Sequence, residues 1–139
     1  MKIFLKSTIF ISIIVIVPFL QISVNSQTQF ELNKSACDKY GNADKELNKI
    51  YKRILVEYKS NTTFIRKFKV AQKVWKNFRD AHIELIFPGK NKHFVYGSVF
   101  PMCNCIHLTN ITIERIEQLK VWIDGIKEGD VCSGSIKTK

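Results

Sequence analysis

A single stretch, residues 70–85, limits the possible fold more than any other part of this chain. Its apolar residues recur at steps of three and four, the spacing of one face of an α-helix with about 3.6 residues per turn. A second stripe beside it mixes an amide, an indole, a guanidinium and an imidazole. The apolar stripe contains Ala71, Val74, Trp75, Phe78, Ala81 and Leu85, and the mixed stripe contains Gln72, Trp75, Arg79 and His82. Such a helix needs partners, and residues 43–58 and 109–123 carry apolar faces of the same period.

The connections between these segments indicate a small antiparallel bundle. Residues 60–63 form a short link in which Asn61 or Thr62 can cap the second helix, and a short link between long helices implies a hairpin. The pair Pro88 and Gly89 should end that helix at Phe87. The predicted fold is therefore all-α, a bundle of three to four helices in one domain.

The limits of the outer helices follow from similar signals. Residues 35–38, Ser-Ala-Cys-Asp, resemble a capping box, so the first helix is expected to begin there and to run to about Tyr58. The polar residues 27–34 are then expected to be frayed, and Gly41 weakens the first turns. The last helix follows the Cys-Asn-Cys element at 103–105 and should end near Gly125.

The first 26 residues have the pattern of a secretory signal. Lys2 and Lys6 precede the apolar run 9–20, and Val24 and Ser26 occupy the small-residue positions before a cut at Gln27. The apolar run is shorter than the roughly 20 residues of a membrane span. We therefore expect export to the periplasm or the exterior, with residues 27–139 as a single domain and without a transmembrane span.

The cysteines support the same compartment. All four lie after residue 26, and an even number in a small exported domain predicts disulfide bonds. They are Cys37, Cys103, Cys105 and Cys132. Cys103 and Cys105 are too close in sequence to pair readily with each other, so one should pair with Cys37 and the other with Cys132. The order is left open.

The residues offer little for catalysis or metal binding. The sequence has no nucleophile elbow, and Asp80 and His82 are two residues apart on a helix, so they face different directions. Cys103, Cys105 and His107 alternate, but zinc sites favour spacings such as C-x2-C. We expect no enzyme, no cofactor and no metal.

The formal net charge of +10 favours anionic partners through long-range attraction. The basic residues are spread over all helices without a nucleic-acid-binding signature, so nucleic acid is not an expected partner. A half-buried polar set is expected to fix the register of the helices, because a buried guanidinium must find acceptors. Its members are Asn48, Gln72, Arg79 and Arg115, with Trp75 among them and Asp80 as a further acceptor.

These residues resemble the LprI-like family of exported proteins, named for a lysozyme inhibitor. The resemblance rests on Cys37, on residues 43–48 with Tyr51, on the Q-x-x-W-x-x-x-R-D pattern at 72–80, on Gly97 and Ser98, and on the T-x-x-R pattern at 112–115. It covers residues 37 to about 119. It implies a helical, disulfide-stapled envelope protein whose activity is the inhibition of lysozyme.

Two functions follow as expectations. The first is non-covalent blocking of a lysozyme, in which the basic and aromatic loop 90–98 enters the cleft that holds the catalytic carboxylates. The candidate binding residues of this loop are Lys90, Lys92, His93, Tyr96 and Ser98, with Lys92 or His93 meeting the carboxylates. The alternative is a structural or stress-related module that binds anionic cell-wall or membrane material.

Overall fold

The computed structural model describes residues 27–139, and the predicted signal at 1–26 lies outside the described residues. Three long helices form the domain, joined at one end by two short helical turns. In chain order they are α1 (Gln29–Glu57), α2 (Thr62–Ile86), α3 (Lys92–Tyr96), the 3-10 turn η1 (Gly97–Val99) and α4 (Phe100–Asp124). The all-α bundle predicted from periodicity is confirmed.

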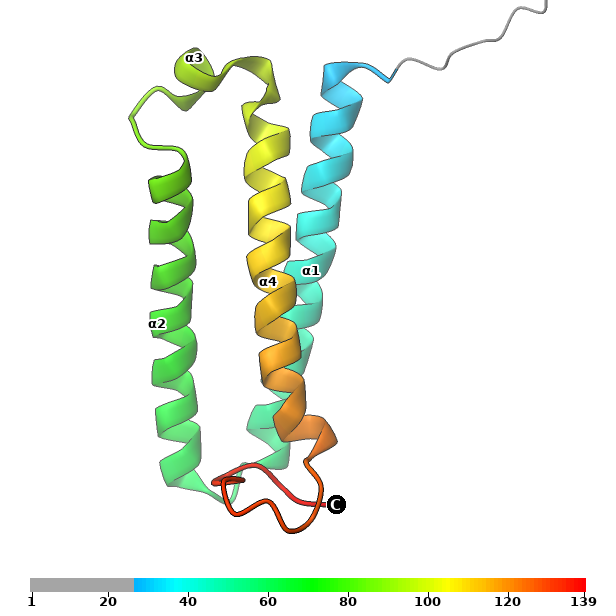
Figure 1. Cartoon of the computed structure of the whole chain (residues 1–139), viewed down its shortest axis with the longest axis vertical. Coiled ribbons are helices and arrows are strands. Elements are labelled where there is room, and N and C mark those ends of the chain that lie inside the picture. Colours follow the sequence, from blue (N-terminus) through cyan, green and yellow to red (C-terminus); the bar gives the residue numbers. More distant parts are fainter. Residues whose placement is uncertain (1–26) are drawn as a thin grey trace, which may run out of the picture.

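Helices α1 and α4 lie side by side and run in the same direction, and α2 runs opposite to both (Figure 1). The α1–α4 pair forms the most extensive helix–helix contact of the described chain, and α2 packs more loosely against it. We call the end with the α1–α2 connection the hairpin end. The other end, which holds α3 and the disulfide bond described below, is the disulfide end.

The beginning of α1 differs from the prediction. The helix begins at Gln29, six residues before Ser35, because Thr28 and Glu31 form the true capping box. The Thr28 hydroxyl accepts a hydrogen bond from the Glu31 amide, and the Glu31 carboxylate accepts one from the Thr28 amide. Gly41 does not interrupt the helix. Residues 29–34 are therefore helical rather than frayed.

Most ends of the other helices follow the predictions, but α4 begins at Phe100, so it contains the Cys-Asn-Cys element that was expected to precede it. Asn61 caps α2, since its side chain accepts a hydrogen bond from the amide of Phe64. The helix ends at Ile86 with Phe87 as its C-cap, just before Pro88 and Gly89. α4 ends at Asp124, and Gly125 follows with a positive φ of 75°, a conformation that glycine adopts without strain.

The hydrophobic core is concentrated toward the hairpin end. Its fully buried members come from α1, α2 and α4: Leu47, Ile50, Ile54, Phe68, Ile116, Leu119 and Ile123. A row of aromatic rings closes this end. Phe64 stacks on Tyr58 at 4.4 Å between centroids, and Phe68 stacks on Tyr51 at 5.1 Å. The aromatic residues of α2 thus fill the space that separates it from α1 and α4.

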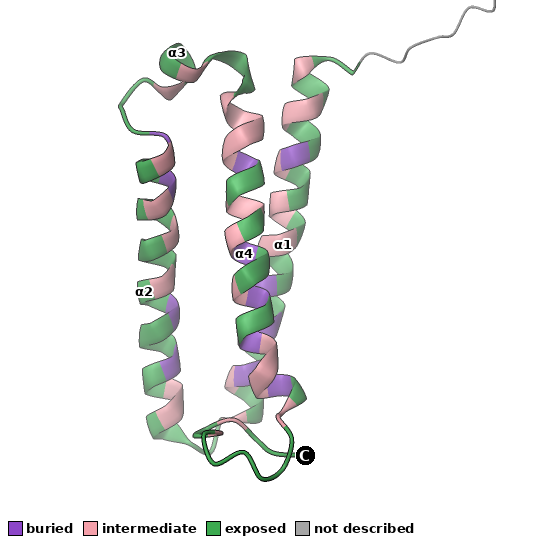
Figure 2. Cartoon of the chain, in the orientation of Figure 1, coloured by how far each residue is buried: buried purple, intermediate pink, exposed green. Residues whose placement is uncertain are grey.

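The face that α2 buries is not the one expected. Figure 2 shows buried residues on the side of α2 that faces the other helices. That side carries Phe68, Gln72 and Ile83, each less than a tenth exposed, so the mixed stripe rather than the apolar stripe points inward. The predicted burial of Val74, Phe78 and Leu85 is wrong: these side chains are 60%, 55% and 76% exposed.

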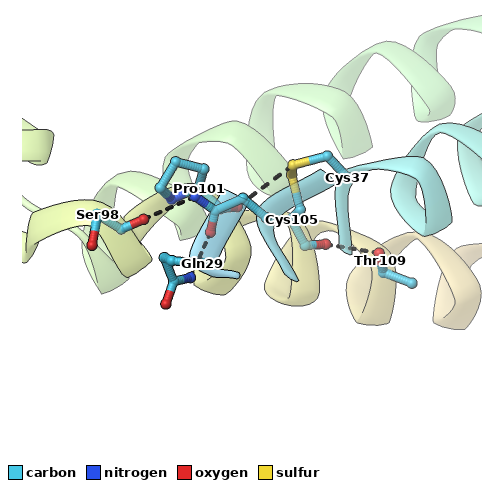
Figure 3. The surroundings of a disulfide bond; sticks show 7 residues. Gln29, Cys37, Ser98, Pro101, Cys105 and Thr109 are labelled. Carbon is cyan, nitrogen blue, oxygen red and sulfur yellow. Dashed lines mark hydrogen bonds between the residues drawn. A yellow bond between two sulfur atoms is a disulfide. The ribbon is translucent and has the colours of Figure 1, made fainter. Parts of the chain in front are cut away.

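One disulfide bond joins α1 to α4, between Cys37 and Cys105 (Figure 3). Thr109, one turn further along α4, donates a hydrogen bond to the carbonyl oxygen of Cys105 at 2.7 Å. At the same end, Asn33 donates a hydrogen bond to the carbonyl oxygen of Ser98. These contacts attach the start of α1 to the α3–α4 region.

The prediction of a second disulfide is wrong. Cys103 is a free, half-buried thiol near the start of α4, and Cys132 is a free, exposed thiol in the tail that follows this helix. The 21 residues of α4 that follow Cys103 place its end roughly 30 Å away, at a rise of about 1.5 Å per residue. The two thiols therefore lie at opposite ends of the bundle.

The C-terminal tail packs under the hairpin end. Residues Ile126 and Thr138 form an isolated β-bridge, and Lys137 pairs with Glu57 at 3.0 Å. The hydrogen bonds from Lys137 and Arg53 hold the pKa of Glu57 below its ordinary value. Across residues 27–139, none of the helices combines the length and the apolar composition that crossing a bilayer requires.

Candidate functional site

The polar residues predicted to act together do meet between α2 and its two partners. Gln72 is 5% exposed, and its Oε1 atom accepts a hydrogen bond from Nε of Arg115 at 3.1 Å. Nη1 of Arg115 donates to Gln118 on the same helix. Burial lowers the pKa of Arg115, and its acceptors in the described chain are amides, not carboxylates. The Gln72–Arg115 bond thus joins α2 to α4 through one charged hydrogen bond.

Trp75 lies beside this bond and contacts two guanidinium groups. The Cζ atoms of Arg79 and Arg115 lie 5.5 and 5.7 Å from the centre of its ring. The electron-rich face of an indole attracts cations at this distance, by about 0.5–2 kcal/mol depending on exposure. Since Arg79 comes from α2 and Arg115 from α4, the ring is held at the interface of these helices. The unusual stripe on α2 is therefore a contact surface.

The second guanidinium connects α2 to α1. Arg79 binds Asp80 at 2.8 Å and lies 3.8 Å from Asp44 of α1. The side chain of Asn48 donates to the carboxylate of Asp44 at 2.9 Å. Burial, as the largest cause, raises the pKa of Tyr40 above its ordinary value near these charges. Arg79, Asp44 and Asp80 therefore form an ionic cluster at the α1–α2 contact, and Asn48 joins it through Asp44.

Two members of the predicted motifs have other surroundings. Tyr51 belongs to the aromatic row, where it stacks on Phe68. Thr112, one turn before Arg115, is completely buried in α4, and its hydroxyl has no hydrogen-bond partner among residues 27–139. Cys103, Cys105 and His107 lie on this helix and not on a strand. A step of two residues on a helix turns by about 200°, so Cys105 faces away from Cys103 and His107, which are four residues apart and share a face.

The loop predicted to bind a partner is a short structured connection at the disulfide end. We call residues 90–98 the tip. Lys92 forms an ion pair with Glu84 of α2, and Tyr96 donates a hydrogen bond to the carbonyl oxygen of Pro88 at 3.0 Å. His93 lies edge-on against Phe100 at 5.3 Å between centroids. These three candidate binding residues therefore hold the tip in place.

The tip exposes two apolar side chains. Phe94 is 92% exposed and Val95 is 59% exposed, with the exposed Lys90 on the same connection. Leu85, in the last turn of α2 at the same end of the bundle, is 76% exposed. Phe94 was not among the predicted binding residues of this loop, which were polar or charged. Its position beside Lys92 and His93, in a segment without helical periodicity, was the available signal.

A comparison with protein-family models matches residues 22–119 to the family described as Lysozyme inhibitor LprI. The matched region includes α1, α2, α4 as far as Leu119 and the Cys37–Cys105 bond, and only its first five residues lie outside the described part. The chain therefore belongs to the LprI family, as its sequence motifs suggested. No curated protein matches it, and no solved structure matches it.

Proposed function

We propose that this member of the LprI family is an exported protein that blocks a lysozyme non-covalently, with the tip as its main contact surface. The observation that carries the proposal is Phe94, a large apolar side chain that is 92% exposed on a structured connection. Aromatic residues that enter a partner's pocket supply much of the binding energy in protein interfaces.

The surroundings of Phe94 support this role. The tip is attached at Lys92, Tyr96 and Ser98 to three different parts of the bundle. A binding segment held in place before association loses less conformational entropy when the complex forms. The supports at the tip therefore favour the presentation of Phe94 to a concave partner.

The charge of this protein favours contact with the acidic cleft of a lysozyme over contact with the rest of the lysozyme surface. The chain is strongly basic, with a formal net charge of +10, so a basic lysozyme would be repelled at long range. Glycoside hydrolases hold two carboxylates in the cleft that cuts the glycan. Lys90 is exposed beside Phe94, and it is the lysine of the tip that remains available to such carboxylates, because Lys92 is paired with Glu84.

The test is lysis of a bacterial cell-wall suspension by purified lysozymes, with and without the oxidised protein, at two salt concentrations. We expect saturable inhibition that persists at the higher salt concentration. Phe94→Ala should weaken inhibition about tenfold or more, the effect of losing an interface anchor. Val131→Ala is the matched control, because Val131 is 97% exposed but lies in the tail at the hairpin end.

Thermal melting should be unchanged for both variants, since neither side chain is buried. Inhibition that the Phe94 variant retains in full would place the contact surface elsewhere on the bundle. Absence of inhibition against every lysozyme tested would reject the proposed activity.

A further inference from the structure

A groove between α1 and α2, at mid-height of the bundle, is lined by basic and hydrogen-bonding side chains. Its volume is about 270 Å³, and its lining residues are Asn48 and Tyr51 from α1 and Lys69, Gln72, Lys73 and Lys76 from α2. A water molecule occupies about 30 Å³ in the liquid. The groove therefore has room for a small polar group together with the atoms that attach it to a larger molecule.

The three lysines lie on consecutive turns of one helix and face the same groove. Steps of four and three residues separate Lys69, Lys73 and Lys76, so their ammonium groups are neighbours on the surface of α2. None of the three forms an ion pair with any residue from 27 to 139. Like charges at this spacing destabilise a helix, and a bound anion would relieve that repulsion.

The buried amide at the base of the groove is oriented as a donor. A guanidinium can only donate hydrogen bonds, so the bond from Arg115 requires the carbonyl oxygen of Gln72 to point toward it. The NH₂ group of Gln72 donates no hydrogen bond to residues 27–139, and it is not among their buried unpartnered atoms, so solvent in the groove reaches it. Because Gln72 is 95% buried and lines the groove, this group is a preorganised donor at its wall.

The nearest carboxylates do not neutralise the groove. Asp44 on α1 accepts hydrogen bonds from Asn48 and lies near Arg79, while Asp80 on α2 is bound by Arg79. Neither of them lines the groove, and its lining contains no acid. Three lysines and one amide donor thus line a space without a negative charge.

We propose that this groove is a binding site for a phosphate-bearing ligand, held by Lys69, Lys73, Lys76 and the amide of Gln72. Lysine binds phosphate as a mobile point charge, and the amide adds a directed hydrogen bond. The inference does not rest on the inhibition of lysozyme, since the groove lies on the side of the bundle and the tip lies at its end.

The experiment is a calorimetric titration of the protein, expressed from its full-length sequence in an oxidising compartment, with inorganic tripolyphosphate. The variant K69Q/K73Q/K76Q should lose at least tenfold in affinity, because it removes three of the four phosphate contacts. Since binding to the folded state raises the melting temperature, tripolyphosphate should stabilise the original protein and not the variant. The variant without ligand should be at least as stable as the original, because the lysine repulsion is gone.

The matched control is K67Q/K127Q/K139Q, which removes the same charge from exposed lysines that do not line the groove. If the control loses as much affinity as the groove variant, binding is diffuse attraction to a basic surface and the proposal is overturned. It is overturned also if both variants bind as the original does.

Two sources of phosphate are separated by a second titration, with vesicles of phosphatidylglycerol and phosphatidylcholine mixed one to three. Loss of vesicle binding in the groove variant, with binding kept in the control, would support the site and assign it to a lipid headgroup. Loss of tripolyphosphate binding alone would support the site and assign it to a soluble or polymeric phosphate. Unchanged binding in both titrations would overturn the site.

Discussion

The two ends of the bundle are held together by different interactions. At the hairpin end, all three long helices contribute to a buried core, and α2 inserts Phe64 and Phe68 between α1 and α4. At the disulfide end, α1 and α4 are joined covalently, and α2 makes contact through edge-on rings around Phe87. Apolar burial supports one end, and a disulfide with a few aromatic contacts supports the other.

This difference permits apolar residues to be exposed at the disulfide end. At the disulfide end the bond between Cys37 and Cys105 holds the helices without a large core, so nearby side chains need not be buried. Leu85, Phe94 and Val95 are all exposed there. The end that depends least on burial thus exposes Phe94, the side chain on which the proposed contact with a lysozyme rests.

The largest effect expected is from Phe68→Ala at the hairpin end. Phe68 is 6% exposed and stacks on both Tyr51 and Phe64, so its loss leaves a cavity in the core. We expect the free energy of unfolding to fall by about 3–5 kcal/mol, as measured by urea denaturation. Phe78→Ala is the matched control on the same helix, since Phe78 is 55% exposed. Equal losses for the two variants would contradict the assigned burial.

Removal of the disulfide should have the next largest effect. The double variant C37S/C105S opens a loop with a sequence separation of 68, and the loss of a native disulfide costs about 2–5 kcal/mol. Amide hydrogen exchange should accelerate most at the disulfide end, around residues 29–37 and 100–109. Slow exchange should persist near Ile54 and Leu119 in the core. Uniform acceleration along all helices would show that the two ends are not independent.

A smaller loss of stability is expected from a substitution at the middle of the bundle. There, polar contacts hold the helices together in place of apolar burial or a disulfide bond. Gln72→Leu leaves the half-buried Nε of Arg115 without its acceptor, which should cost about 1–3 kcal/mol in thermal or urea unfolding. Gln118→Leu is the control, because Gln118 is an exposed acceptor for the same guanidinium. If Gln72→Leu were neutral, the polar contacts would not be needed to position α2.

Most predictions that rested on local chemistry were confirmed, except the start of α1 and the start of α4. The cap at Asn61, the end of α2 before Pro88 and the end of α4 at Gly125 depend on a few neighbouring residues and the backbone angles they permit. The contact between Gln72 and Arg115 was also within reach, because a guanidinium in a mostly apolar stripe must find an acceptor. The start of α1 was wrong because two capping patterns compete, and the one at Thr28 has the better residue, Glu31.

The predictions that required distances between helices were not reliable. The sequence shows two adjacent stripes on α2, and hydrophobicity alone favours burying the one that contains Val74 and Leu85. The opposite choice results from packing: α1 and α4 take most of their apolar contact from each other, which leaves α2 to bridge a wider space. Long side chains such as Trp75 and Arg79 can span it.

By itself, the sequence determined the helical segments, the family of the chain and the residues of the Gln72–Arg115 contact. Helical periodicity and caps depend on a few neighbouring residues, and a guanidinium in an apolar stripe requires an acceptor. The tertiary structure decided which cysteine pairs with Cys37, which face of α2 is buried and where Phe94 and the lysine groove lie. These features depend on how α4 packs against α1. They depend also on the length of α4, which separates Cys103 from Cys132. Distances between residues on different helices are set only when complete helices pack together.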